Sequence, residues 1–330
     1  MKQYSETICD TVIKDWSMIP RNLKAGKPIL NKKGNPIWRK GGWCKVYKCE
    51  IDGKTKALRL WLNEMEEKEM AERSIAISQF IVAHPSKYLI NFEYIPEGYS
   101  YNGDKYPVIL MDWCQGRTMK QYISDCVEDG DSESLLTLAR QFLEMTNELH
   151  SLGISHGDLQ HDNILITDDG SLKLVDYDSM FVPALKGCTE TIKGKAGYQH
   201  PTARDKNRFL QPYTDYFSEL MIFLTIYLVA HKPELWDSDM VNDDDKEDQL
   251  LFKITEVGEG SQDKYCDYNI KGVPALFGGL QMALLATDLH ALSPLSAYVD
   301  AANIYPSAKK RPTFAPQKTL IADIPDDLFK

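Results

Sequence analysis

One stretch of the sequence decides the fold: His156-Gly157-Asp158-Leu159-Gln160-His161-Asp162-Asn163-Ile164-Leu165-Ile166, followed 13 residues after Asn163 by Asp176 in Lys173-Leu174-Val175-Asp176-Tyr177-Asp178. These polar residues lie between apolar, strand-like runs, so they indicate a site rather than a plain loop. An aspartate, an asparagine five residues later and a second aspartate at the end of a hairpin suit phosphoryl transfer. One carboxylate can accept a proton from a hydroxyl, and the other two side chains offer oxygen ligands to Mg²⁺.

The same residues resemble the H-R-D-x-x-x-x-N and D-F-G motifs of the protein kinase superfamily. Further resemblances follow in the family's order, to the end of an activation segment at residues 194–201 and to the opening of a central buried helix at residues 215–218. The resemblance implies an α+β, two-lobed fold. A small antiparallel β lobe with one helix should be followed by a larger, mainly helical lobe.

Upstream, the segment Met111-Asp112-Trp113-Cys114 resembles the gatekeeper and hinge of that family, and residues 41–48 stand where its glycine-rich loop would be. The resemblance therefore implies ATP as a cofactor together with Mg²⁺, or Mn²⁺ in its place. It assigns catalysis to Asp158 and Arg59, and metal binding to Asn163 and Asp176. It assigns nucleotide binding to Gly41, Gly42, Val46, Ala57, Arg59, Glu72, Met111, Asp112 and Cys114.

The nucleotide-binding part departs from the family pattern in two ways. Arg39 and Cys44 occupy the positions of the outer glycines of the loop, where a side chain hinders close approach of the backbone to phosphate. Arg59 replaces the lysine of the V-A-I-K strand, which keeps the charge but changes the pairing geometry. Its helix partner is Glu69 or Glu72, and Glu72 is favoured slightly.

The catalytic loop and activation segment also differ from the pattern. Gln160 stands where kinases acting on Ser or Thr carry a lysine, and Gly157 removes the arginine that would hold a phosphorylated activation segment. Control through such an arginine is therefore not expected. Thr189 and Thr191 lie in the expected activation segment and are candidate autophosphorylation sites, although plain loop residues are the simpler interpretation.

Local patterns predict the elements around these motifs. Hairpins are expected at Asp52-Gly53 and Asn102-Gly103, because these dipeptides favour tight turns between strands. Helices are expected over residues 6–16, 64–82, 119–127, 134–152 and 215–230. We divide the chain into an N-terminal extension (1–36), an N-lobe (37–113) and a C-lobe (114–330) with an acidic insertion near 237–249.

Composition excludes several classes of function. The 330 residues include 48 acidic and 38 basic side chains, a formal charge of −10 that disfavours nucleic acid and anionic membranes as partners. The longest apolar run, residues 220–230, is far shorter than the ~20 residues that span a bilayer. The seven scattered cysteines and the lack of a secretory signal pattern favour a reducing cytoplasm.

Three functions remain after these exclusions. The first is an ATP-dependent protein kinase that acts on a Ser or Thr hydroxyl of a protein. The second is a pseudokinase, a scaffold that binds a signalling partner, which the degenerate loop and Arg59 favour. The third is a small-molecule phosphotransferase of the aminoglycoside or choline type, which the His-Gly-Asp spelling resembles; the overall His-Gly-Asp-Leu-Gln spelling is also a hint of bacterial origin.

Overall fold

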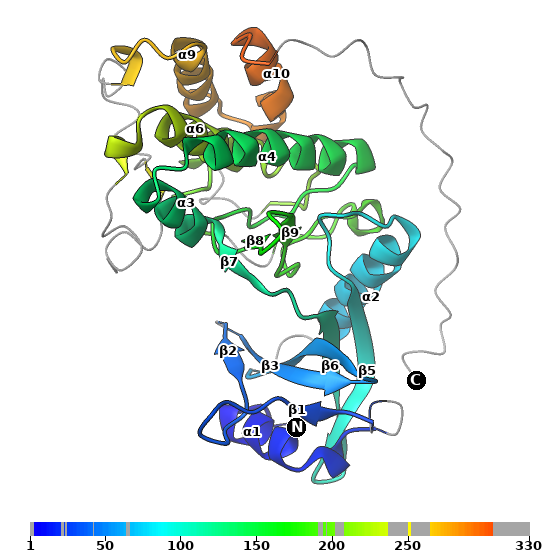
Figure 1. Ribbon diagram of the computed structural model, residues 1–330. Coiled ribbons are helices and arrows are strands. Elements are labelled where there is room, and N and C mark those ends of the chain that lie inside the picture. Colours follow the sequence, from blue (N-terminus) through cyan, green and yellow to red (C-terminus); the bar gives the residue numbers. More distant parts are fainter. Residues whose placement is uncertain are drawn as a thin grey trace.

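The computed structural model describes residues 3–20, 23, 25–41, 43–63, 67–190, 194–195, 197–201, 208–236, 250–251 and 265–305. Within this part the chain forms two lobes, a β-rich one built mainly from the first third and a helical one from the rest (Figure 1). This confirms the expected α+β, two-lobed fold. The predicted acidic insertion, 237–249, lies outside the described residues.

The N-lobe is built on an antiparallel sheet in the order β1-β3-β4-β6-β5, with β2 paired to β3. Both predicted hairpins are present, since Asp52-Gly53 and Asn102-Gly103 adopt the positive φ angles that such turns need. The strands are β1 (Lys27–Pro28), β2 (Trp38–Lys40), β3 (Cys44–Ile51), β4 (Lys54–Trp61), β5 (Phe92–Tyr101) and β6 (Asp104–Asp112).

Two helices flank this sheet. Helix α2 (Glu67–Ala83) lies between the sheet and the C-lobe, whereas α1 (Glu6–Lys14) covers the opposite face (Figure 1). Ser5 caps α1 by accepting a hydrogen bond from the amide of Ile8. The apolar side of α1 is buried in a cluster with strand residues such as Tyr47 and Leu58. The first 36 residues therefore contribute to the N-lobe core.

The C-lobe is organised around α6 (Tyr216–His231), whose residues 217–230 are all buried, as expected for the longest apolar run. Helix α4 (Ser132–Leu152) packs against it and ends at Gly153, which adopts a left-handed conformation. The other helices are α3 (Met119–Glu128), α9 (Val273–Leu284) and α10 (Leu295–Ala301), with 3-10 turns η1 (Trp16–Met18), η3 (Pro183–Leu185), η4 (Pro233–Leu235) and η7 (Leu289–Ala291).

A second small sheet, β7 (Gly116–Thr118), β8 (Ile164–Thr167) and β9 (Leu172–Leu174), lies on the C-lobe side of the lobe junction. Because β8 directly follows the segment 156–163 and β9 ends two residues before Asp176, this sheet fixes both polar motifs on one surface. The core is continuous across the junction, where a bridge joins Leu89 to Leu174. None of the helices in the described residues has the length and hydropathy to cross a bilayer.

Candidate active site

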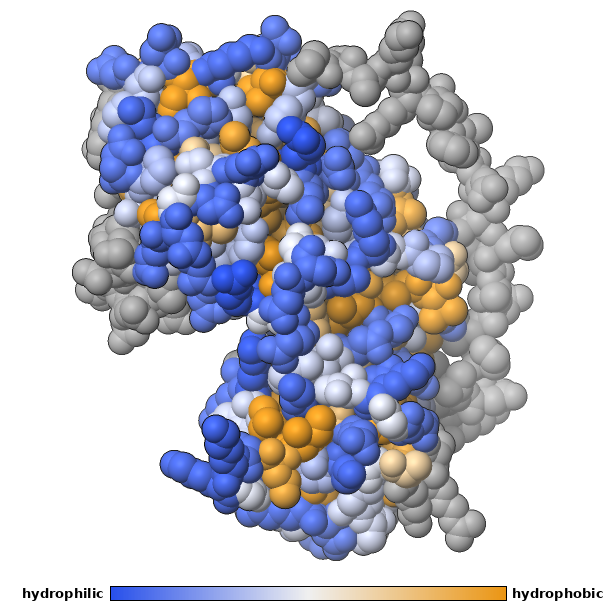
Figure 2. All heavy atoms as spheres, in the orientation of Figure 1, coloured by the Kyte–Doolittle hydropathy of each residue, from blue (hydrophilic) through white to orange (hydrophobic). Residues whose placement is uncertain are grey.

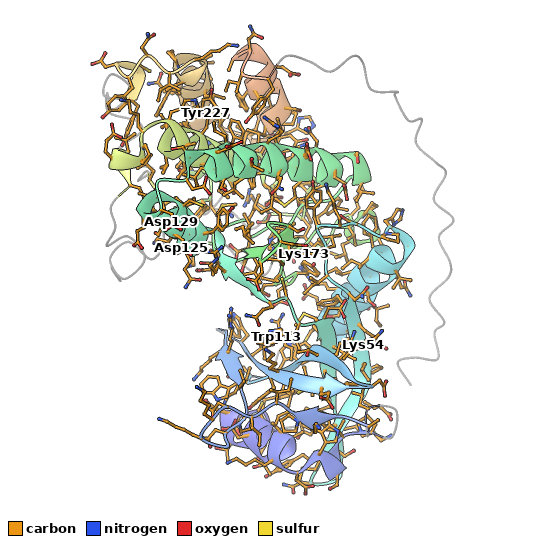
Figure 3. All side chains as sticks on the ribbon, viewed as in Figure 1. Lys54, Trp113, Asp125, Asp129, Lys173 and Tyr227 are labelled. Atoms are coloured by element: carbon orange, nitrogen blue, oxygen red, sulfur yellow. The ribbon has the colours of Figure 1, made fainter. Side chains whose placement is uncertain are left out.

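A cleft of about 270 Å³ lies between the two lobes. The outline of the molecule is hollowed between them on the side of β2 and α3 (Figure 2). Trp113, on the segment that joins β6 to β7, marks this junction (Figure 3). Of the predicted site residues, those that line the cleft are Gly41, Val46, Ala57, Arg59, Met111, Asp112, Cys114, Asn163 and Asp176.

The roof of the cleft is the turn between β2 and β3. The amide of Gly41 donates to the carbonyl of Cys44 at 2.9 Å, which closes the turn. The Cys44 side chain is buried and lines the cleft together with Arg39. Side chains therefore occupy the two places where the family pattern has its outer glycines. Gly42 lies outside the described residues.

At the linker between the lobes, the side chain of Asp112 is turned away to two partners, the Lys56 ammonium and the Asn91 amide. Only the backbone of Asp112 is thus left for a ligand. Within the described part of the chain, no acceptor is bonded to the amide of Cys114. An unpaired amide beside apolar walls formed by Ala57 and Met111 suits the edge of a planar base.

Arg59 projects from β4 into the inner end of the cleft and is 3% exposed. Its Nη1 donates to Asp178 Oδ1 at 2.7 Å and to Asp176 Oδ1 at 3.2 Å, and its Nη2 donates to Asp178 Oδ2. Burial acts to lower the pKa of Arg59, but the neighbouring groups, Asp178 first and Asp176 with it, together outweigh burial and raise that pKa. The guanidinium is therefore held as a cation by two carboxylates.

This pairing corrects the expectation that Arg59 contacts Glu72 or Glu69. Glu72 is exposed on α2, and Glu69 accepts a hydrogen bond from Arg73 at 3.0 Å. The physical reason is Asp178, which stands at the glycine position of D-F-G and offers a partly buried carboxylate. A planar guanidinium pairs with both oxygens of such a group, which a lysine ammonium cannot do.

The segment 156–163 places Asp158 next to Asn163. The side-chain amide of Asn163 donates to the carbonyl of Asp158 at 2.8 Å and to its Oδ2 at 3.2 Å. Because both bonds use the nitrogen, the Oδ1 of Asn163 remains the end that can accept a cation. The amide of Lys195 donates to Asp158 Oδ1 at 3.2 Å, so both carboxylate oxygens of Asp158 are oriented.

The backbone at position 157 requires glycine, which explains why this loop reads His-Gly-Asp. It adopts φ +80°, and a Cβ there would overlap the carbonyl oxygen of Ser179 and lie 2.8 Å from its carbonyl carbon. Asp215, at the start of α6, accepts hydrogen bonds from the amides of His156 and Gly157, the latter at 2.9 Å. Burial raises the pKa of Asp215 to about 6. The loop thus rests on a buried carboxyl and permits no side chain at position 157.

His156 has a structural role. Its side chain is fully buried, and Nε2 donates to the carbonyl of Val175 at 2.9 Å. This bond ties the loop to the residue before Asp176. Asp176 itself adopts φ +67°, a conformation that aspartate tolerates better than most residues, with its side chain 51% exposed.

The donor set for a metal is small. In the described ranges there is no group of three or more His, Cys, Asp or Glu side chains that could hold a metal ion. Asn163 and Asp176 nevertheless line the same cleft. Mg²⁺ is commonly bound by one or two protein oxygens, with phosphate oxygens and water completing its shell, so these two residues fit a metal that arrives with a nucleotide.

The activation segment contacts both lobes where it is described. Arg73 of α2 donates to the carbonyl of Thr189, and the amide of Glu190 donates to the carbonyl of Arg208 at 2.7 Å. Thr189 is exposed. Thr191 lies outside the described residues.

Two residues at the site were not predicted from the sequence. Asp178 is the last residue of the D-F-G-like triplet, and the motif does not indicate that it is the main partner of Arg59. Lys195 lies in the activation segment, and nothing in its pattern indicates the contact with Asp158. An unexpected charge at each position was the only available signal.

Comparison with known proteins agrees with this geometry. The family model for the protein kinase domain matches residues 40–274, so the chain belongs to the protein kinase family. It is 30% identical over 139 residues to the serine/threonine-protein kinase PknL of Mycobacterium tuberculosis, which covers 41% of this chain and 33% of that protein. It is 26% identical over 122 residues to the serine/threonine-protein kinase pak-1 of Caenorhabditis elegans, 35% of this chain and 19% of that protein.

A third relative is the serine/threonine-protein kinase STE20 of Eremothecium gossypii, 25% identical over 119 residues. This alignment covers 35% of the chain and 11% of that protein. The chain thus spans a third or less of the length of these relatives. They support a protein kinase-like phosphotransferase as its general class.

Proposed function

We propose that this chain is an ATP- and Mg²⁺-dependent protein kinase whose acceptor is a Ser or Thr hydroxyl of a protein substrate. The observation that carries the proposal is that Asn163 and Asp176 line one cleft with the unpaired Cys114 amide, with Asp158 hydrogen-bonded to Asn163. The serine/threonine kinases among its relatives support the choice of acceptor.

Each residue has a defined part in this proposal. The Cys114 amide and the Asp112 carbonyl hold the adenine, and apolar side chains such as Val46 and Ala57 exclude water from it. Asn163 Oδ1 and the Asp176 carboxylate hold Mg²⁺, which neutralises phosphate charge when it is bound with ATP. Mn²⁺ takes the same oxygen ligands.

The transfer step runs between Asp158 and the nucleotide. Asp158 accepts the proton of the acceptor hydroxyl while the hydroxyl oxygen bonds to the γ-phosphorus. The bond from the γ-phosphorus to its bridging oxygen breaks, and ADP leaves. Arg59, through its ion pairs with Asp176 and Asp178, fixes the metal-binding aspartate and adds positive charge at the inner end of the cleft.

A pseudokinase is the second candidate, and the pairing of Arg59 favours it. Both terminal nitrogens of Arg59 are engaged by carboxylates, so fewer donors remain for the phosphates. In that case the fold would bind a signalling partner without transfer. The odd number and scattered positions of the seven cysteines in the sequence support a further proposal, that the protein works in a reducing compartment such as the cytoplasm.

The test is transfer of the labelled γ-phosphate of ATP, to the protein itself and to a generic protein substrate, with Mg²⁺ or Mn²⁺. We expect labelling by the wild type and a fall of roughly 10³-fold in Asp158→Asn, which removes the base but keeps its size. Absence of label in the wild type with both metals would contradict the proposal and favour the pseudokinase. Label on an added aminoglycoside or choline alone would favour the small-molecule alternative.

A further inference from the structure

The catalytic loop lacks a cation of its own. Gln160, which stands where kinases acting on Ser or Thr carry a lysine, is 4% exposed, and its Oε1 accepts a hydrogen bond from the amide of Asp162 at 2.8 Å. Its side chain thus stabilises the loop from within. Asp162 lines the cleft, and Asp158 is hydrogen-bonded to Asn163, which also lines it, so two carboxylates lie close to the place where a phosphoryl group would pass.

A lysine from the activation segment reaches the same loop. The Nζ of Lys195 donates to Asp162 Oδ2 at 2.8 Å, and the amide of Lys195 donates to Asp158 Oδ1 at 3.2 Å. A single residue therefore contacts the proposed base through its backbone and the neighbouring carboxylate through its ammonium. Asp162 lines the nucleotide cleft beside Asn163, so this ammonium is held at the edge of the cleft.

The backbone before Lys195 fixes this position. Gly194 adopts φ +64°, and a Cβ there would lie 2.8 Å from Asp158 Oδ1 and 2.6 Å from Gln199 Nε2. Only glycine permits so close an approach of the segment to the carboxylate of Asp158. The Lys195 side chain is 21% exposed, so the ion pair with Asp162 is partly screened from water.

The balance of charge shows why such a cation matters. Two carboxylates, those of Asp162 and Asp176, line the cleft. Those of Asp158 and Asp178 are bonded to the cleft residues Asn163 and Arg59, and Arg59 is paired with both Asp176 and Asp178. A phosphoryl group that leaves ATP is itself negatively charged and is repelled by these carboxylates. A second cation on the side of the acceptor hydroxyl therefore lowers the activation barrier to phosphoryl transfer. An ammonium has three donors and can serve a carboxylate and a phosphoryl oxygen together.

We propose that Lys195 contacts the γ-phosphoryl group during transfer and supplies the cation that position 160 lacks. This inference rests on the proposed function. The activation segment would then provide part of the catalytic machinery as well as a docking surface. The lysine makes no bond to phosphorus. It stabilises the oxygens of the group while the new bond forms to the acceptor and the bond to ADP breaks.

The first measurement compares Lys195→Met with the wild type. We expect kcat to fall roughly 10²-fold, the range seen when one donor to a transition-state oxygen is removed, while the affinity for ADP and the melting temperature change little. Lys186→Met is the matched control, because Lys186 is an exposed lysine after η3 and does not line the cleft. It should stay within twofold of the wild type.

A second readout does not depend on turnover. Aluminium fluoride with ADP and Mg²⁺ imitates the transferring group, so Lys195→Met should bind this complex at least tenfold more weakly relative to ADP alone. Adding Gln160→Lys to Lys195→Met should recover at least tenfold in kcat, since the cation returns from the loop side. A wild type that transfers no phosphate would overturn the proposed function. The ratio of the affinity for the aluminium fluoride complex to the affinity for ADP alone would still decide the role of Lys195.

Two results would overturn the inference itself. One is a Lys195→Met variant with kcat within threefold of the wild type. The other is a variant in which ADP and the aluminium fluoride complex lose affinity by the same factor, because that would show a structural role of the segment rather than a contact to the γ-phosphoryl group.

Discussion

Asp176→Ala is expected to reduce phosphoryl transfer by roughly 10³-fold or more, because it removes the only carboxylate proposed to hold the metal. The Asp176 side chain is half exposed in the cleft beside Asn163, whereas the carboxylate of Asp162, which also lines the cleft, is paired with the Lys195 ammonium. ATP should still enter the cleft, but its affinity should no longer increase when Mg²⁺ is added. Steady-state rates and nucleotide titrations with and without Mg²⁺ measure both effects.

Two further variants separate metal binding from folding. Alanine is disfavoured at the φ of +67° that Asp176 adopts, whereas asparagine tolerates it, so Asp176→Asn should lose activity with less effect on the melting temperature. Asp168→Ala, an exposed aspartate in the β8–β9 turn, should behave as the wild type. A wild-type rate in Asp176→Asn with Mg²⁺ would show that the metal is held elsewhere.

Gly157→Ala should strongly destabilise the fold. The left-handed conformation alone costs an alanine about 1–2 kcal/mol. The overlap of its Cβ with the Ser179 carbonyl adds roughly 1–3 kcal/mol or more, because the loop is held by Asp215 and cannot move away without losing two hydrogen bonds. We expect a loss of about 3–5 kcal/mol in the free energy of unfolding, measured by urea denaturation.

Gly170→Ala is the control for this change. Gly170 has φ +79°, almost the same as that of Gly157, but a Cβ there meets nothing within 4 Å. The difference between the two variants therefore isolates the steric overlap. Equal losses of stability would mean that the contact between Gly157 and Ser179 is loose in solution.

Local patterns predicted most of the fold because they depend on neighbours in sequence. Asp52-Gly53 and Asn102-Gly103 form the expected hairpin turns, and α4 ends at the expected Gly153. The N-terminal helix was expected from its own pattern, but its place on the sheet was not. Its packing depends on an apolar face meeting strands more than 30 residues away, which no local signal encodes.

In the site, too, the sequence patterns predicted which residues lie in the cleft but not the contacts between distant segments. The cleft brings together the residues that kinase spacing indicated, such as Asn163 and Asp176, because motif order fixes where strands and loops end. The predicted partner of Arg59, Glu72 or Glu69, was wrong. Arg59 stands where kinases carry a lysine and Asp178 where they carry a glycine, and these two unusual residues pair with each other. The contact of Lys195 was missed for a similar reason, since it joins segments more than 30 residues apart.

Every step proposed for this kinase begins with nucleotide binding in the cleft, so the decisive measurement is the affinity of the wild-type chain for ATP with and without Mg²⁺. We expect saturable binding that becomes at least tenfold tighter when Mg²⁺ is present, through Asn163 and Asp176. No saturable binding of ATP under either condition, or equal affinity in both, would contradict the account.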